Sequence, residues 1–537
     1  MSIVAGIDFG TQSVRVCLVD HERGRLGSGQ CSYPLYRCPD DIHHASQRHQ
    51  DHLQGLESAM AAALASSGIR GHQVEALAVD TTGSTIVPVG EGLEPLDDYY
   101  LWCDHRAWRE AEEITRIARE TSQKALAWSG GTYLSEFGLS KLLHWLRHHP
   151  HLRSRFATAV EHCDLITAVL CGITDPEKLP RSICAMGHKW LWNAALGGFP
   201  SEEFLIAIDP LLAGIHSRMG GCYAKSDRLA GTLCNHWAAR LGLRAGIPIP
   251  VGGLDAHWDA VGAGIRPGSA VNVIGTSTCI MALSSHAVPI PGVCGVVDGS
   301  IHPDWIGIEA GLSAVGDLFD AIARRATTTT ADLFHKIEHY RSGQTGLLRI
   351  PWDNGDRTIL GNPLLRGMTI GWNLLHEAAD ELFAAIEGTA FQTRLILERM
   401  TDYGVSIERI INTGGIPRKS NVLNQAYANV LKTPLLVPQA ETTSLGSAFF
   451  AFLALGTFPT LEEAQNALCP EYQTIEPESR GMAVCDELFG HFRELYQSFD
   501  VRQFSPSSLN SLMVSLEQAT HSDIMSHSGT MSARGSE

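Results

Sequence analysis

The chain has 537 residues, of which 44% are hydrophobic and 18% are charged, and its mean hydropathy is -0.02. This composition excludes an intrinsically disordered protein, and the length favours two or more domains. With 41 basic against 58 acidic residues the formal net charge is -17, and a field of that sign repels phosphate backbones and anionic lipids. We therefore expect no nucleic-acid partner and no membrane partner, although a small anion could still bind in a locally positive pocket.

The two ends of the chain and its cysteines indicate a cytoplasmic protein. Residues 1–10 lack the basic segment and the long apolar segment of a signal peptide. The longest apolar run near the other end, residues 448–455, is much shorter than the ~20 residues that span a bilayer. The 13 cysteines are odd in number and form no CxxC pair, so we expect buried, reduced thiols rather than a zinc ribbon or a disulfide framework.

In the first half of the chain, apolar β-branched runs that end in Gly or Asp predict strands, and longer periodic stretches predict helices. The predicted strands are residues 3–7, 14–19, 74–79 and 247–251, and the predicted helices are 104–120 and 139–148. The second helix ends where Pro150 follows His149, because proline disfavours a helical residue before it.

The second half continues the alternation of strands and helices. Strands are predicted at residues 270–274, 279–283 and 407–412, and helices at 376–401 and 421–431. Because strands and helices interleave along the whole chain, the predicted fold class is α/β. The long helix has one apolar face, formed by Leu375, Ala379, Leu382, Ile386 and Ala390.

A weak internal duplication divides the chain. The turn at residues 10–13 (GTQS) and the turn at 275–278 (GTST) each lie between two apolar runs, about half a chain apart. This spacing predicts two similar domains that face each other across a cleft, with Gly and Pro residues at 264–268 marking the boundary. The predicted domains are residues 1–264 and 265–504, and the serine-rich residues 505–537 are expected to be a mobile tail.

The two turns are candidate phosphate-binding sites. A tight turn of Gly and small hydroxyl residues presents several backbone N–H groups to one point, which is how many proteins hold phosphates. Only the first turn has an acid two residues before its glycine, Asp8, whereas Val273 stands at that place in the second. Asp8 is therefore a candidate ligand for Mg²⁺, an ion that uses few carboxylates; the alternative is that Asp8 only caps the turn.

Other nucleotide and metal motifs are absent from the sequence. Glycine is never followed by lysine, which excludes a P-loop, and no GxGxxG follows a predicted strand. His376 and Glu377 begin like a zinc-protease motif, but Asp380 stands where the second histidine belongs.

A group of histidines lies near the end of the predicted helix 139–148. His144 and His148 are four residues apart, and His149 and His151 follow, but no carboxylate or cysteine lies among them. A solvated helix end is therefore favoured over a metal site.

Asp255 is a candidate catalytic base. It ends a predicted strand and follows Gly252 and Gly253, and ligands of open α/β sheets bind at the carboxyl ends of strands. A carboxylate there could accept the proton of a hydroxyl group as its oxygen attacks the γ-phosphate of ATP. The alternative is a structural aspartate in a turn.

The order and spacing of nine short segments resemble those of the FGGY carbohydrate kinases, from residue 5 to about residue 476. Within the family the resemblance is strongest to the branch that phosphorylates L-ribulose. It implies two ribonuclease-H-like domains of the actin and hexokinase type that flank a cleft and close over sugar and ATP. The segments are GIDFGT at 6–11, DTTGST at 80–85, EHCD at 161–164, CAMGHK at 184–189, DAH at 255–257, GTSTC at 275–279, EAG at 309–311, SAVGD at 313–317 and NGDR at 354–357.

The resemblance also implies roles for individual residues. Asp255 would be the base that activates the terminal sugar hydroxyl, and Asp8 would lie at the Mg²⁺. Gly414 and Gly415 would pack against adenosine, where a residue without a side chain lets the backbone approach. The implied sugar contacts are Gly83, Lys189, Asp255 and Glu309, and the implied ATP contacts are Thr11, Gln12, Ser13, Arg15, Gly275, Thr276, Gly311, Gly414 and Gly415. The resemblance is also compatible with a homodimer.

Two residues depart from the pattern of the L-ribulose branch. Cys103 stands where lysine is usual, and Leu312 stands where glutamine is expected. The expected reaction is ATP-dependent phosphorylation of L-ribulose to L-ribulose 5-phosphate, as in L-arabinose catabolism. The alternatives are a kinase for another ketopentose or a pentitol, such as D-ribulose, xylulose or ribitol, and a non-catalytic nucleotide-binding sensor on the same fold.

Overall fold

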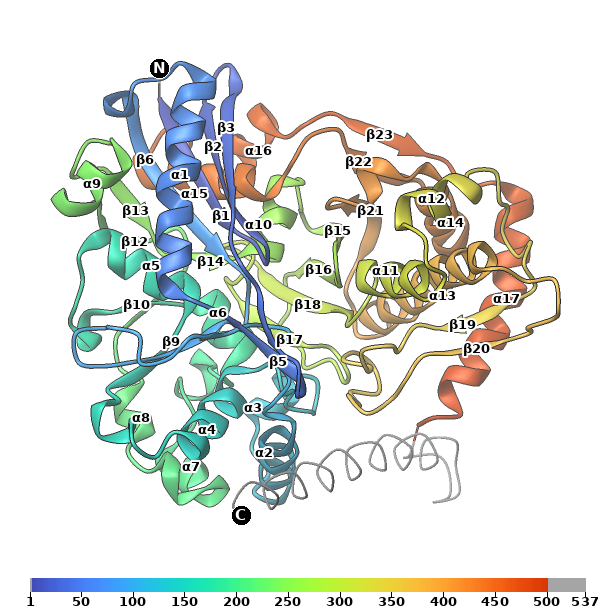
Figure 1. The fold of residues 1–537 in the computed structure, drawn as a ribbon, viewed down its shortest axis with the longest axis horizontal. Helices are drawn as coiled ribbons and strands as arrows, with labels where there is room; N and C mark the ends of the chain where they lie inside the picture. The colour runs from blue at the N-terminus through green and yellow to red at the C-terminus, as the bar shows by residue number, and fades with distance from the viewer. Residues whose placement is uncertain (1, 501–537) are drawn as a thin grey trace, which may run out of the picture.

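A computed structural model describes residues 2–500 and shows two halves that meet at a shared centre (Figure 1). The first half contains a five-stranded sheet in the order β14-β6-β1-β2-β3. Strand β1 is antiparallel to β2 and parallel to β6, and β6 is parallel to β14. The bounds are β1 Ile3–Phe9, β2 Ser13–Asp20, β3 Gly24–Ser32, β6 Val74–Thr81 and β14 Gly253–Leu254.

The second half contains a seven-stranded sheet in the order β17-β18-β16-β15-β21-β22-β23. Its five inner strands repeat the first sheet, because β15 is antiparallel to β16 and parallel to β21, which is parallel to β22. The predicted α/β class and the two ribonuclease-H-like domains are therefore confirmed. The bounds are β15 Gly268–Ile274, β16 Thr278–Ser284, β17 Gly295–Asp298, β18 Ile306–Leu312, β21 Ile407–Thr413, β22 Leu435–Pro438 and β23 Tyr472–Ile475.

Two helices lie between the sheets and belong to both halves. Helix α10 (Asp255–Gly262) packs against α15 (Thr443–Leu455), and α15 also packs against β1 and β6. The helices approach so closely that a Cβ on Gly446 would overlap the main-chain oxygen of Trp258. Although α15 falls in the predicted domain 265–504, it covers the sheet of the first half. One buried cluster accordingly draws on both halves, with Val4, Ala78, Trp258, Val271, Ile411 and Phe450 among its members.

A second layer of elements completes the first half. A further five-stranded sheet has the order β4-β5-β8-β7-β9, and helices pack beside it. The strands are β4 Tyr36–Cys38, β5 Asp41–Gln47, β7 Ile86–Val89, β8 Tyr99–Tyr100 and β9 Thr158–Glu161. The helices of the first half include α1 His49–Ser67, α2 Trp108–Glu120, α3 Ala125–Trp128, α4 Gly138–His148, α5 His162–Cys171, α6 Ile183–Lys189, α7 Glu202–Ile208 and α9 Asn235–Leu241.

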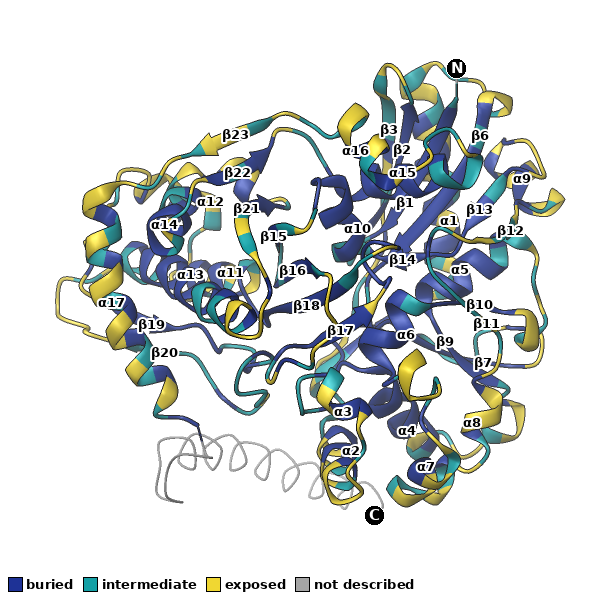
Figure 2. Ribbon diagram, turned by 180° about the vertical axis from the view of Figure 1, so that it is seen from behind, coloured by how far each residue is buried: buried dark blue, intermediate teal, exposed yellow. Residues whose placement is uncertain are grey.

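Helices also cover the sheet of the second half. Helix α13 is its long central helix and contacts α11, α14 and α17. The inner strands of both main sheets are largely buried, whereas the edge strands β3 and β23 and the outer helices have exposed residues (Figure 2). The bounds are α11 Gly316–Arg325, α12 Thr330–Lys336, α13 Ala378–Asp402, α14 Asn421–Leu431, α16 Leu461–Leu468 and α17 Ser479–Gln497.

Three expectations need correction. Leu375 was expected on the apolar face of the long helix, but it precedes α13 and is 88% exposed, because Glu377 and Asp380 form a capping box that starts the helix after it. Helix α2 begins at Trp108 rather than at residue 104, and the Asp104 carboxylate instead accepts the N–H of Ala45 from a distant strand. All 13 cysteines are free, but Cys38 and Cys222 are exposed rather than buried.

Among residues 2–500, no helix combines the length and the apolar character needed to cross a membrane. The predicted tail, residues 505–537, lies outside the described residues.

Candidate active site

A cleft of about 380 Å³ lies between the two halves and brings together most of the predicted site residues. It is lined from the first half by the turn after β1 and from the second half by the turn after β15. The predicted residues on its walls are Asp8, Thr11, Gln12, Arg15, Gly83, Lys189, Asp255, Gly275, Thr276, Glu309, Gly414 and Gly415.

Two predicted ATP contacts lie beside the cleft rather than on its walls. Ser13 starts β2, and its hydroxyl accepts a hydrogen bond from Gln30 Nε2 at 2.9 Å. Gly311 lies on β18, where a Cβ would overlap the main-chain oxygen of Thr278 and the guanidinium of Arg357. Its role in this structure is therefore to let a strand and a side chain approach, and its part in nucleotide binding stays a prediction.

Three hydrogen bonds hold the first turn in place. The Gly10 N–H donates to Ser13 O at 3.0 Å, and the hydroxyl of Tyr33 donates to Gly10 O at 2.5 Å. The indole N–H of Trp102 donates to Thr11 Oγ1 at 3.0 Å. These contacts fix the shape of the turn at the cleft.

The second turn has a similar closure but different neighbours. The Gly275 N–H donates to Ser277 O at 2.9 Å, and Gly316 N–H donates to Gly275 O at 3.0 Å. Gly414 has a φ of 100°, and a Cβ there would overlap Ile274 O, so the chain requires glycine. A Cβ on Gly415 would meet no atom within 4 Å, which leaves that face open to a ligand.

A group of buried carboxyls lies on the wall of the first half. Asp8 Oδ2 accepts a hydrogen bond from Arg15 Nη1 at 2.7 Å, and burial raises the pKa of Asp8 to about 6. Burial, with the charge of Asp8, holds the pKa of Asp80 well above its usual range and raises that of Asp255 to about 7. Burial also raises the pKa of Asp259, which accepts hydrogen bonds from Thr442 and Thr443.

These carboxyls fit a divalent cation. Among the described residues, neither Asp8 Oδ1 nor Asp80 Oδ1 receives a hydrogen bond from a donor group, although both oxygens are buried. Buried carboxylate oxygens without donors are stabilised by a cation, and hard oxygen ligands suit Mg²⁺. Of these two residues Asp8 lines the cleft and Asp80 does not, so Asp8 is the one whose carboxyl could reach an ion in the cleft.

Asp255 lines the cleft at the junction of a strand and a helix. It follows β14 directly and is the first residue of α10, and its Oδ1 accepts the N–H of Ala256 at 2.7 Å. The first turn of a helix carries free N–H groups that stabilise a carboxylate. Asp255 therefore presents a raised-pKa carboxyl to the cleft from a rigid helix end.

Lys189 and Glu309 form a buried ion pair across the cleft. Lys189 Nζ lies 2.7 and 2.9 Å from the two oxygens of Glu309, which joins α6 of the first half to β18 of the second. His257 Nε2 lies 3.1 Å from Glu309 Oε2, and His257 Nδ1 lies 2.9 Å from Cys184 Sγ. Although burial opposes ionisation, Lys189 and His257 hold the pKa of Glu309 well below its usual range.

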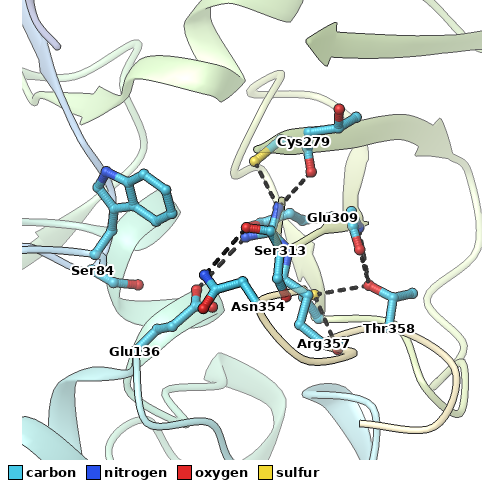
Figure 3. Close-up of polar contacts among 12 residues, drawn as sticks. Ser84, Glu136, Cys279, Glu309, Ser313, Asn354, Arg357 and Thr358 are labelled. Atoms are coloured by element: carbon cyan, nitrogen blue, oxygen red, sulfur yellow. Dashed lines mark hydrogen bonds and ion pairs between the residues drawn. The ribbon is translucent and has the colours of Figure 1, made fainter. Parts of the chain in front are cut away.

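A second cross-cleft pair, Arg357 and Glu136, was not predicted. Arg357 Nη1 lies 3.7 Å from Glu136 Oε2, and Nη2 donates to Thr278 O at 2.5 Å (Figure 3). Both side chains line the cleft with Lys189 and Glu309. Arg357 lies in the segment at 354–357 that carries the family resemblance, and that segment was the available signal; Glu136 had none.

Neither departure from the L-ribulose branch lines the cleft. Cys103 is buried in a cluster with Leu101 and Leu165, and Arg37 Nη2 lies 3.6 Å from its sulfur. Leu312 is buried at the end of β18 in the core of the second half. The two substitutions therefore change the packing behind the cleft and not its walls.

Comparison with known proteins agrees with this geometry. The N-terminal domain of the FGGY family of carbohydrate kinases matches residues 3–262, and the C-terminal domain of the same family matches residues 270–455. A ribulokinase of Vibrio parahaemolyticus is 33% identical over 93% of this chain and 96% of its own length. A ribulokinase of Geobacillus thermodenitrificans is 30% identical over 92% of this chain and 94% of its own.

Solved structures support the fold. The ligand-bound xylulose kinase of Lactobacillus acidophilus superposes with a TM-score of 0.78 at 18% identity, over 93% of this chain and 99% of that one. The xylulose kinase of Rhodospirillum rubrum gives a TM-score of 0.76 at 21% identity, over 93% and 99%. Two matching domains that together span most of the chain, with a cleft between duplicated sheets, establish that this chain belongs to the FGGY family of carbohydrate kinases.

Proposed function

We propose that this carbohydrate kinase transfers the γ-phosphoryl group of ATP to the terminal hydroxyl of L-ribulose and so forms L-ribulose 5-phosphate. The observation that carries the proposal is the position of Asp255 in the cleft, between the carboxyls around Asp8 and the ion pair of Lys189 with Glu309. The two relatives described above, both ribulokinases by name, support ribulose as the acceptor, and the resemblance to the L-ribulose branch favours its L form.

In the proposed mechanism, Asp255 accepts the proton of the attacking hydroxyl. Its carboxyl has a pKa near 7, so it can take a proton at neutral pH and release it after transfer. Lys189 offers ammonium donors and Glu309 offers carboxylate acceptors, and both bind and orient the sugar hydroxyls. Glu136 and Arg357 line the same cleft and exclude water when the halves close.

The two turns and Asp8 serve the nucleotide. The N–H groups of the turns at 10–13 and 275–278 bind phosphate oxygens, with Arg15 as the local cation of the first turn. Gly414 and Gly415 give the adenosine a surface without side chains. Asp8 would hold Mg²⁺ together with the phosphates, and the bound ion would supply positive charge to offset the negative charge of the transferred group.

Replacing Asp255 with asparagine tests the proposal. Removal of a general base lowers kcat by about 10²–10⁴-fold. A coupled assay of ADP release with L-ribulose measures this loss, and calorimetry with a non-hydrolysable ATP analogue measures nucleotide binding, which we expect to be retained. Turnover within a few-fold of the unmodified enzyme would overturn the role of Asp255.

The stability of the same variant is the control for folding. The pKa of Asp255 is raised in the folded chain, so its contribution to stability is present below pH 3.8 and is lost as the pH rises through about 7. Asp255→Asn removes this loss. We therefore expect its melting temperature at pH 8 to equal or exceed that of the unmodified protein, even though the variant is inactive.

A panel of acceptors tests the substrate. Turnover with L-ribulose far above that with D-ribulose, xylulose or ribitol supports the proposal. A preference for one of these other compounds would show that the protein is a kinase with a different acceptor. ATP hydrolysis that no sugar stimulates would favour a nucleotide-binding sensor instead. A cytoplasmic location and a homodimer complete the proposal, and light scattering of the purified protein measures the second.

A further inference from the structure

Two histidines and a glutamate meet on the first half, at a site that the proposed reaction does not use. Helix α4 carries His144 and His148, which are one helical turn apart and lie on the same face. The adjacent helix α2 carries Glu110, and the two helices pack together. The sequence around the histidines contains no carboxylate, and the fold supplies one from a distant segment.

The three side chains have the geometry of a metal site. One donor atom from each of them lies within 4.8 Å of the others, and the rings of His144 and His148 stack with centroids 4.0 Å apart. His144 Nδ1 lies 3.4 Å from Glu110 Oε2. The residues Glu110 and His144 are only 4% and 9% exposed, and His144 Nδ1 makes no hydrogen bond within the described part of the chain.

The hydrogen bond that His148 makes through Nδ1 leaves its Nε2 available to bind a metal ion. His148 Nδ1 lies 2.8 Å from the main-chain oxygen of His144, and a carbonyl oxygen only accepts, so Nδ1 carries the proton. The lone pair is then on Nε2. Metal-binding histidines commonly donate their second ring N–H to a carbonyl in this way, which fixes the tautomer that binds the ion.

The surrounding charges favour a cation. Arg147 is paired with three acids: its Nη1 lies 3.2 Å from Glu110 Oε1, and its Nη2 lies 2.6 Å from Glu113 Oε2 and 2.8 Å from Asp209 Oδ2. One guanidinium faces three carboxylates, so the net charge of the group is negative. Glu110 uses Oε1 for Arg147 and turns Oε2 toward His144, which leaves this oxygen available to an ion.

We propose that Glu110, His144 and His148 bind a zinc ion that clips α2 to α4. Two imidazoles and one carboxylate are a donor set that Zn²⁺ accepts, and two histidines four residues apart on a helix are a recurring half of such sites. His148 lies at the surface, so the ion enters from solvent and keeps water at its fourth position. The alternative is a metal-free contact between a histidine and a glutamate.

Zinc binding by the full-length protein tests the proposal. The unmodified chain and two variants, His148→Ala and His151→Ala, are dialysed against Zn²⁺ alone, and bound zinc is measured by mass spectrometry. His151 is exposed on the same helix end and outside the cluster, so it is the matched control. We expect His148→Ala to bind one zinc ion fewer per chain, with affinity at this site reduced by at least about 10-fold.

Thermal unfolding gives a second readout that does not depend on activity. Zinc should raise the melting temperature of the unmodified protein and of His151→Ala, and should raise that of His148→Ala less, because an ion that binds only the folded chain stabilises it. Another group of possible ligands is His188, His257 and Glu309, of which the last two line the cleft. This group is common to all three proteins, so its zinc binding cancels in the comparison. Equal zinc content and equal thermal shifts in the two variants would overturn the proposal.

Discussion

The two halves of the molecule share a sheet topology but not a set of charges. In the first half, Asp8 pairs with Arg15 across β1 and β2 and lies beside Asp80 of β6. In the second half, Val273 occupies the place of Asp8, pairs with Cys279 and lies beside Thr413. The duplicated fold therefore supplies a backbone turn in each half, the two turns that we propose for phosphate binding, whereas the buried carboxyls proposed for metal and proton chemistry lie in the first half only.

The largest expected effect breaks this asymmetry directly. Asp8→Asn removes a carboxylate that lines the cleft and that we propose to act at the phosphates, and loss of one preorganised electrostatic contact lowers kcat by about 10²–10³-fold. Val273→Asn places the same side chain at the equivalent position of the second half, and we expect a change below about 3-fold because no charge is lost there. Steady-state kinetics over a range of Mg²⁺ concentrations measures both. Equal losses would mean that the halves contribute alike.

The next effect concerns the contact that joins the halves. Gly446→Ala forces a Cβ into Trp258 O between α10 and α15, and overpacking of this kind lowers the free energy of unfolding by about 1–3 kcal/mol. Gly490→Ala is the matched control, since Gly490 is exposed on α17 with no atom within 4 Å of a Cβ and should gain about 0.5–1 kcal/mol. Urea unfolding measures both changes. A tolerated Gly446→Ala would show that the helices separate readily.

The smallest effect sharpens the role of the second half in nucleotide binding. Gly415→Ala adds a methyl group where the structure is open, so the melting temperature should not change while KM for ATP rises by about 3–10-fold through loss of about 1 kcal/mol of contact. Gly414→Ala should lower the melting temperature as well, because its φ of 100° is strained for alanine. An unchanged KM for ATP in Gly415→Ala would show that the adenosine does not bind against Gly415.

The strands and the turns could be predicted from the sequence because they depend on short local patterns of residues. Short β-branched runs and glycine turns gave β1, β2, β15 and β16 within two residues, and the repeated turn gave the duplicated fold. Features that depend on contacts between distant segments could not be predicted in this way. Leu375 was assigned to a helix that a capping box starts later, and no local pattern could show that α15 packs against β1 and β6, which lie far from it in the sequence.

The site shows the same division. Asp8, Asp255, Lys189 and Glu309 lie in short motifs, and the structure brings them to one cleft. Glu136 is an ordinary acid in a loop, and only the fold places it opposite Arg357. Likewise, only the packing of α2 on α4 brings Glu110 next to His144, and the spacing of residues within either helix could not predict this contact.

The position of α15 constrains how the chain folds during synthesis. The sheet of the first half is complete at β14, yet the helix that covers one of its faces is made from residues 443–455. The first half therefore leaves the ribosome with an apolar face unburied, and it has to wait for most of the second half before that face is covered. A chain cut near residue 264 should give two fragments that aggregate separately and regain activity only when they are produced together.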